Sequence, residues 1–64
     1  MKNQIKVLRA QNDLTQAELA EKVAVSRQTI NAIEKGKFDP SLPLAFKLSD
    51  LFKKSIEEIF QNEE

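Results

Sequence analysis

The 64-residue sequence contains no cysteine and no histidine. Disulfide bonds, thiolate chemistry, zinc fingers and the usual imidazole acid–base or metal-binding roles are therefore excluded. No nucleophile–base pair, metal cluster or phosphate-binding loop is visible, so we expect neither an enzyme nor a cofactor. No run approaches the roughly 18 apolar residues needed to cross a bilayer, and the first four residues lack the apolar core of a signal peptide. These absences predict a cytoplasmic protein with no membrane partner.

Glycine and proline are also scarce. Glycine occurs once, at Gly36, and proline twice, at Pro40 and Pro43, in a chain otherwise rich in helix formers. No alternating pattern of the kind that marks a strand competes with the helical spacing. The sequence predicts an all-α fold with one domain over residues 1–64, whose single core supplies only a few kcal/mol unless a second subunit reinforces it.

The charges are balanced in number but not in position. A net charge of zero counts against a nucleic-acid-binding domain, since such domains are usually basic. All ten basic residues lie at or before Lys54, however, together with only six of the ten acidic ones. The remaining acids are Glu57, Glu58, Glu63 and Glu64. We expect this acidic end to point away from any polyanion.

Boundary signals divide the first half of the chain into three short helices. The first has an apolar face and ends near Asn12, where turn residues follow. Thr15 and Glu18 have the spacing of a capping box, which predicts that the second helix begins there. Ser26 is a good N-cap for the third, so the second is only about two turns long. The inward-facing residues of these helices are predicted to be Ile5, Leu8, Leu19, Ala20, Val23, Ile30 and Ile33.

Two more helices are predicted after Gly36, the residue best able to adopt the left-handed conformation that ends a helix. Ser41 can cap the fourth helix, which tolerates Pro43 in its first turn. Ser55 and Glu58 repeat the capping-box spacing and begin a short fifth helix. The apolar residues of these two helices are Leu44, Ala45, Leu48, Leu51, Phe52, Ile56, Ile59 and Phe60.

Two short helices joined by a tight turn, the first opened by a capping box and the second by a serine, are typical of helix-turn-helix DNA readers. Three segments resemble the phage Cro and cI repressor family: QAELA at 16–20, VSRQTINAIEKG at 25–36 and PSL at 40–42. The resemblance covers nearly the whole chain. It implies a five-helix lambda repressor-like domain of the compact, stand-alone kind that acts as a homodimer on operator DNA.

The third predicted helix, from about residue 27 to residue 35, is expected to read the duplex. At about 100° per residue, the side chains opposite the two inward isoleucines are Gln28, Asn31, Ala32 and Lys35. Arg27 lies at the edge of this face in the first turn, which usually enters the major groove. Arginine can bond guanine O6 and N7, and glutamine or asparagine can bond adenine N6 and N7. The predicted base-contacting residues are therefore Arg27, Gln28 and Asn31; the alternative is an ordinary solvated helix face.

The DNA backbone is expected to be held on both sides of this helix. The resemblance implies that Gln16 bonds a phosphate beside the N-terminus of the second helix. Lys35 and Lys37 would add positive charge at the other end. The alternative is that they are only a solvated helix end, stabilised by the helix dipole. The complete set of predicted phosphate-contacting residues is Gln16, Ser26, Thr29, Lys35 and Lys37. The resemblance also implies an ion pair between Arg9 and Glu34, which we interpret as structural.

The sequence departs from the family pattern at two helix ends. Ala24 occupies a turn position where the family often has glycine, so we expect a left-handed conformation that costs ~1–2 kcal/mol. Lys53 and Lys54 replace the glycine and small apolar residue that often close the fourth helix. The geometry of that helix end is therefore left open.

A chain this small is expected to keep apolar surface that two copies would bury against each other. Leu44, Ile56 and Phe60 are the predicted homodimer contacts; the alternative is that the apolar residues of the fifth helix all belong to the core. A two-fold dimer would place its recognition helices about 34 Å apart, one turn of DNA, and would require a roughly palindromic operator.

These patterns predict a sequence-specific regulator of transcription, most simply a repressor, that binds an operator in double-stranded DNA as a homodimer. The alternative is a protein-interaction module, such as an antitoxin or adaptor, that uses the exposed face of the third or fifth helix. No sensor domain or small-molecule effector site is evident, so we expect the signal to be a partner protein, concentration or competition for the operator.

Overall fold

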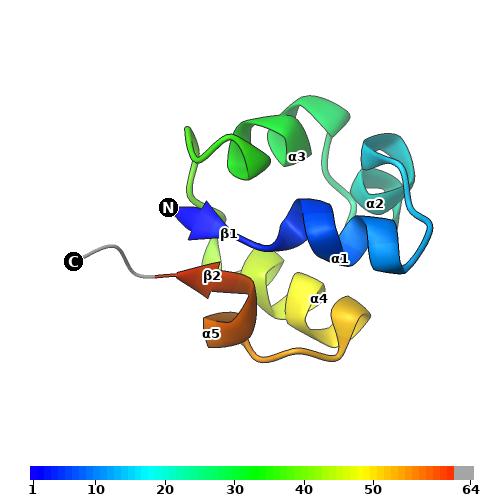
Figure 1. Ribbon diagram of the computed structural model, residues 1–64. Coiled ribbons are helices and arrows are strands. Elements are labelled where there is room, and N and C mark those ends of the chain that lie inside the picture. The colour runs from blue at the N-terminus through cyan, green and yellow to red at the C-terminus, as the bar shows by residue number, and fades with distance from the viewer. Residues whose placement is uncertain (62–64) are drawn as a thin grey trace.

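The computed structural model describes residues 1–61 and contains, within them, five helices and one pair of short strands (Figure 1). The five helices are the predicted ones, so the all-α class is confirmed. Glu63 and Glu64, which belong to the predicted acidic end, lie outside the described residues. In chain order the elements are β1 (Lys2–Asn3), α1 (Ile5–Gln11), α2 (Gln16–Lys22), α3 (Arg27–Glu34), α4 (Leu42–Phe52), α5 (Ile56–Ile59) and β2 (Phe60–Gln61).

Side-chain caps begin α2, α3, α4 and α5 at the predicted residues. The Thr15 hydroxyl accepts a hydrogen bond from the Glu18 amide at 3.0 Å, and the Glu18 carboxylate accepts one from the Thr15 amide at 2.9 Å. Ser55 and Glu58 form the same reciprocal pair, and the other two helices have single serine caps. Helices of four to eight residues are unstable in isolation, so caps and tertiary packing must hold α2, α3 and α5 together.

The two capping boxes should make stability depend on pH. The hydrogen bonds from Thr15 and Ser55 lower the pKa of Glu18 and Glu58 below their usual values. Their stabilisation is therefore fully present above the unfolded pKa of about 4.3 and is lost as the pH falls through the lower folded pKa. Because glutamine can still close a capping box, the double variant E18Q/E58Q should lose less stability on acidification.

Thermal unfolding between about pH 5 and about pH 3 measures this difference. The wild-type curve should fall more steeply than that of E18Q/E58Q. Parallel profiles for the two proteins would show that these carboxylates contribute nothing to the acid sensitivity.

Left-handed residues end the first four helices. Their φ angles are 54° at Asp13, 59° at Ala24, 74° at Gly36 and 55° at Lys53. After α2, the amides of Ala24 and Val25 bond back to the carbonyls of Glu21 and Ala20 at 3.3 and 3.0 Å, which is the Schellman motif. The predicted left-handed conformation of Ala24 is confirmed, whereas its energetic cost stays a prediction. Helix α4, whose end was left open, closes in the same way with Lys53 at the left-handed position.

Replacing Ala24 with glycine should stabilise the fold. Alanine in this conformation costs ~1–2 kcal/mol, whereas the extra freedom of glycine in the unfolded chain costs ~0.5–1 kcal/mol. Ala24 is exposed, so its methyl group contributes little packing. We expect a net gain of ~0.5–1 kcal/mol, with Tm rising by about 4–8 °C per kcal/mol. Ala10, exposed within α1, is the matched control: A10G should destabilise by up to ~1 kcal/mol. Equal effects from the two variants would contradict the strain at position 24.

All five helices contribute to one hydrophobic core. The predicted inward residues of α1, α2 and α3 are all buried, whereas Leu51 and Ile56 are only partly buried at its edge. The fully buried side chains with the largest volumes are Ile5, Leu19, Ile30, Ile33, Leu48 and Ile59. Within residues 1–61, no helix is long and apolar enough to span a membrane.

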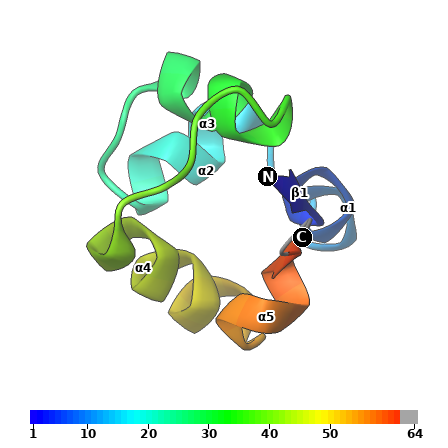
Figure 2. The same cartoon turned by 90° about the vertical axis from the view of Figure 1, so that its left-hand side faces the viewer.

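The strand pair was not predicted. β1 and β2 run antiparallel with Lys2 opposite Gln61 and Asn3 opposite Phe60, and the Gln4 amide donates to the Ile59 carbonyl at 2.8 Å. Phe60 was predicted to lie in the fifth helix; instead it leaves α5 with an extended backbone and is buried. Strands of two residues are too short to show alternation. Their pairing brings the two ends of the described chain side by side (Figures 1 and 2).

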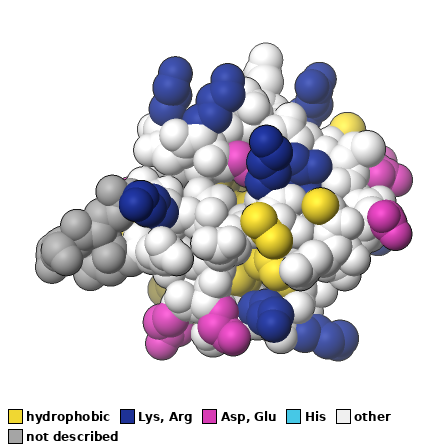
Figure 3. Space-filling model, viewed as in Figure 1, with side chains coloured by type: hydrophobic (Ala, Val, Ile, Leu, Met, Phe, Trp, Pro, Cys, Tyr) yellow, Lys and Arg dark blue, Asp and Glu magenta, His cyan; other side chains and the backbone are white. Residues whose placement is uncertain are grey.

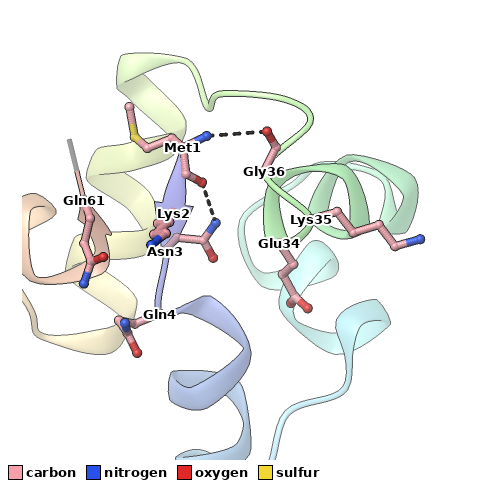
Figure 4. A pocket seen from close by; sticks show the side chains of 8 residues that line it. All are labelled: Met1, Lys2, Asn3, Gln4, Glu34, Lys35, Gly36 and Gln61. Atoms are coloured by element: carbon pink, nitrogen blue, oxygen red, sulfur yellow. Dashed lines mark hydrogen bonds between the residues drawn. The ribbon is translucent and has the colours of Figure 1, made fainter. Parts of the chain in front are cut away.

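Asn3 connects this strand pair to the end of α3. Its side-chain amide donates to the Ile33 carbonyl at 2.8 Å and to the Met1 carbonyl at 3.3 Å, while its Oδ1 accepts from the Ile5 amide at 3.2 Å. Figure 4 shows the Asn3 side chain extending from the N-terminal strand toward the last turn of α3. One side chain therefore ties β1, the start of α1 and the C-terminal turn of α3 together.

Candidate nucleic-acid interface

The recognition helix predicted from the sequence is α3, beginning at Arg27 immediately after its serine cap. Ile30 and Ile33 are 0% and 1% exposed and anchor one face in the core. Arg27, Gln28 and Lys35 are exposed, and Asn31 and Ala32 are partly buried. The helix lies at the edge of the molecule with α2 packed against it (Figures 1 and 2). The geometry is that of a helix-turn-helix whose second helix presents a polar face to solvent.

The predicted base-contacting residues surround one open hollow. It has a volume of about 230 Å³ and is lined by Gln16, Arg27, Gln28 and Asn31. The side chains expected to contact bases thus lie next to the one that the resemblance implies for a phosphate. Their convergence depends on how α2 packs on α3, which neither helix determines alone.

The ion pair that the resemblance implied, between Arg9 and Glu34, adjoins Gln16, one of the residues that line this hollow. Arg9 Nε is 2.6 Å from Glu34 Oε2, and a second guanidinium nitrogen donates to Oε1 at 3.1 Å. The third nitrogen donates to the Leu14 carbonyl at 3.0 Å. The two side chains are only 15% and 8% exposed, and the hydrogen bond that Arg9 donates to Glu34 raises the pKa of Arg9. The pair joins α1, the turn before α2 and the last turn of α3.

Gln16 extends this network into the hollow. Its amide nitrogen donates to Glu34 Oε1 and to Asn31 Oδ1, both at 3.2 Å. Both of its N–H groups are thereby used within the protein, so a phosphate can be bonded by this amide only if one of these bonds is given up. The phosphate contact of Gln16 stays a prediction. The sequence did not indicate the bond to Asn31.

The remaining predicted phosphate contacts lie around α3. The Ser26 hydroxyl accepts from the Thr29 amide at 3.1 Å and lies 2.9 Å from the Thr29 hydroxyl, so both residues also serve the cap. Lys35 and Lys37 are exposed at the C-terminal end of the helix, and Figure 4 shows the Lys35 side chain pointing away from the N-terminal strand. All four stay predicted phosphate contacts.

Phe38 was not among the predicted site residues. It is 52% exposed and, with Ser26, Gln28, Thr29 and Ala32, lines a second open hollow of about 240 Å³ on the other flank of α3. The sequence did contain a signal for Phe38: it is an aromatic residue two positions after Gly36, the glycine that ends the predicted recognition helix. Apolar groups of this kind contact thymine methyl groups in the major groove.

Charged side chains of both signs lie on the surface. In Figure 3, lysine and arginine side chains project along the edge formed by α3, and acidic ones gather near α5 and on the side of α2, with further basic side chains beside those near α5. Helices α3 and α5 lie at opposite ends of the molecule in both ribbon views. Glu57 and Glu58, the described part of the acidic end, belong to α5 and so lie on a helix far from α3; that this end points away from a polyanion stays a prediction.

The predicted dimer contacts differ in how much surface they offer. Leu44 and Phe60 are only 6% and 7% exposed and form part of the core, and Ile56 is partly buried. The sequence did not distinguish Leu44 from its neighbours because α4 is apolar around most of its circumference, and it did not predict that Phe60 leaves α5 for a strand. Leu42 and Phe46, on the same helix, are the exposed ones, at 63% and 55%.

The fold and the arrangement of α2 and α3 define a helix-turn-helix protein. Residues 5–59 match the helix-turn-helix family, and the chain belongs to this family, of the Cro/cI type. It is 62% identical over 60 residues, covering 94% of this chain and 91% of the relative, to an uncharacterized HTH-type transcriptional regulator of Methanocaldococcus jannaschii. It is 48% identical over 64 residues to YgzD of Bacillus subtilis, which carries the same description; the match covers this whole chain and 97% of YgzD. The chain is thus a DNA-binding regulator of transcription.

Proposed function

We propose that this protein represses transcription by binding a palindromic operator as a homodimer, with α3 in the major groove. The observation that carries the proposal is the exposed polar face of α3. Arg27, Gln28 and Asn31 surround one hollow, and the two buried isoleucines hold the opposite face of the helix in the core. Repression requires only that the operator be occupied. A domain of this size can do that without a surface for contacting other transcription proteins.

A second copy would make the complex specific. One recognition helix covers few base pairs, whereas two helices about 34 Å apart read two half-sites on the same side of the duplex. We propose the apolar surface around Leu42 and Phe46 as the dimer contact. Leu42 lines a hollow of about 220 Å³ with Ile56 and Phe60, so two of the three predicted contacts form its inner wall.

Selection of binding sites from random duplexes at fixed salt tests the proposal. We expect a palindrome whose half-sites are about 10 base pairs apart. Sedimentation should detect a dimer that L42D converts to a monomer, and the selected operator placed over a reporter promoter should lower expression. No enrichment of any duplex would refute DNA binding by this face, and raised expression would refute repression.

The alternative is a protein-interaction module such as an antitoxin or adaptor. Phe38, Leu42 and Phe46 are all more than half exposed, which is the observation that favours it. Under this alternative the protein would enrich no duplex, and L42D would abolish the binding of a partner protein rather than self-association. The two functions are therefore separated by the same selection experiment.

A further inference from the structure

We infer that Gln16 and the Arg9–Glu34 pair determine which base Asn31 can read, by controlling which end of the Asn31 amide faces the DNA. This inference rests on the proposed function and deepens it, because it assigns a specificity-determining role to residues behind the recognition face. Arg9 and Glu34 contribute as positioning residues.

The direction of the hydrogen bonds in the network follows from the charged pair. A carboxylate can only accept, so the atom of Gln16 that lies 3.2 Å from Glu34 Oε1 must be the amide nitrogen. The same nitrogen lies 3.2 Å from Asn31, so the atom it contacts there must be the carbonyl oxygen. Arg9 holds the Glu34 carboxylate in place with two hydrogen bonds. The orientation of both amides is thus dictated by an ion pair on α1 and α3.

The consequence appears at the surface of the hollow. Asn31 is partly buried and its carbonyl oxygen is turned toward the Gln16 amide nitrogen, so the end of its amide group that is turned away from Gln16 presents N–H donors. The paired contact with adenine needs a donor to N7 and an acceptor for N6 at once. Guanine instead presents two acceptors, O6 and N7, in the major groove. Asn31 in this setting is therefore matched to guanine, although asparagine on a recognition helix usually indicates adenine.

The network acts as a relay from the interior to the base. Figure 4 shows the Glu34 side chain leaving the last turn of α3, and its Oε1 accepts the hydrogen bond from Gln16 on α2. Removing the Gln16 donor frees the Asn31 carbonyl oxygen, and the amide then regains its ability to pair with adenine. Replacing the Glu34 carboxylate with an amide allows Gln16 and Asn31 to turn over together, which exposes the Asn31 oxygen.

Site selection from random duplexes with the full chain and four variants tests the inference. N31A identifies the base position that depends on Asn31. At that position we expect the wild type to prefer guanine over adenine by roughly tenfold, and Q16M to reverse the preference. E34Q should shift it toward adenine or cytosine, which offer amino donors. Gln11, exposed at the end of α1, supplies the control: Q11M makes the same chemical change outside the network and should select the wild-type site.

Two results would overturn the inference: adenine at the Asn31-dependent position in the wild type, or the same base in Q16M as in the wild type. Methionine keeps the length and helix propensity of glutamine, and circular dichroism of each variant confirms its folding.

The free protein provides a measurement that does not depend on DNA. In spectra of the side-chain amides, the Gln16 N–H groups should exchange with water more slowly than those of Asn31, since only the former are donated within the protein. Protected Asn31 amide protons beside rapidly exchanging Gln16 protons would overturn the inference even if the protein binds its operator. Failure of the wild type to enrich any duplex, with the expected exchange pattern intact, would refute the proposed function and leave the hydrogen-bond relay in place.

Discussion

Arg9→Ala is expected to destabilise the protein by about 3–5 kcal/mol, most of what a domain of this size has. Glu34 is 8% exposed and accepts two hydrogen bonds from Arg9. Without the guanidinium, a carboxylate that is almost buried keeps, among residues 1–61, only the amide of Gln16 as a hydrogen-bonding side-chain partner. The Leu14 carbonyl also loses a donor. Urea denaturation followed by circular dichroism measures the change.

Two variants make this result interpretable. Lys6 is exposed on the same helix, and K6A should change stability by no more than about 0.5 kcal/mol. The double variant R9M/E34L replaces the whole pair with apolar side chains and should recover much of the loss, because well-packed apolar residues often replace a buried ion pair without cost. If R9A costs no more than K6A, the pair is effectively solvated and cannot orient Gln16.

Arg27→Ala is expected to weaken binding to the selected operator by about 1–3 kcal/mol per half-site and to relax the preference at one base position. Arg27 is exposed in the first turn of α3 and lines the hollow with the other predicted readers. Its effect should depend on sequence: large on the best site and small on a site already mutated at that base pair. Competition binding with single-base variants of the operator measures this.

Lys37→Ala is the comparison for Arg27. Lys37 is exposed beyond the end of α3, and a phosphate contact there should strengthen binding to every duplex alike. K37A should weaken all sequences about equally and lower the slope of log K against log salt by about one. Identical behaviour of R27A and K37A across sequences and salt would mean that the assignment of base readers and backbone contacts is wrong.

Local sequence signals were sufficient for the five helices and for the residues that begin four of them. Thr15, Ser26, Ser41 and Ser55 cap the helices at which they were placed, and Ala24 adopts the left-handed conformation expected of its turn. Capping involves residues within four positions of each other, so sequence spacing contains the necessary information. The family resemblance added the Arg9–Glu34 pair, which joins residues 25 positions apart and has no local signature.

The strand pair and the burial of the predicted dimer contacts were not predictable in the same way. β1 and β2 meet only because α1 and α5 bring residues 2–3 and 60–61 together. Phe60 becomes a core residue because this pairing pulls it out of α5. Whether an apolar residue of α4 is covered depends on which side faces the other helices, and the apolar face of that helix is too broad for periodicity to decide between Leu44 and Phe46.

The sequence by itself determined the bounds of α3 and the face of it that Arg27, Gln28 and Asn31 share, away from its buried isoleucines, because helical periodicity and caps are local properties; on this basis it predicted α3 as the recognition helix. Only the tertiary structure decided which hydrogen-bond donors and acceptors those side chains present. The bond from Gln16 to Asn31 crosses from one helix to another, and its direction is imposed by a carboxylate that an arginine of a third helix holds in place. A hydrogen bond between distant residues depends on atomic positions that the order of amino acids does not contain.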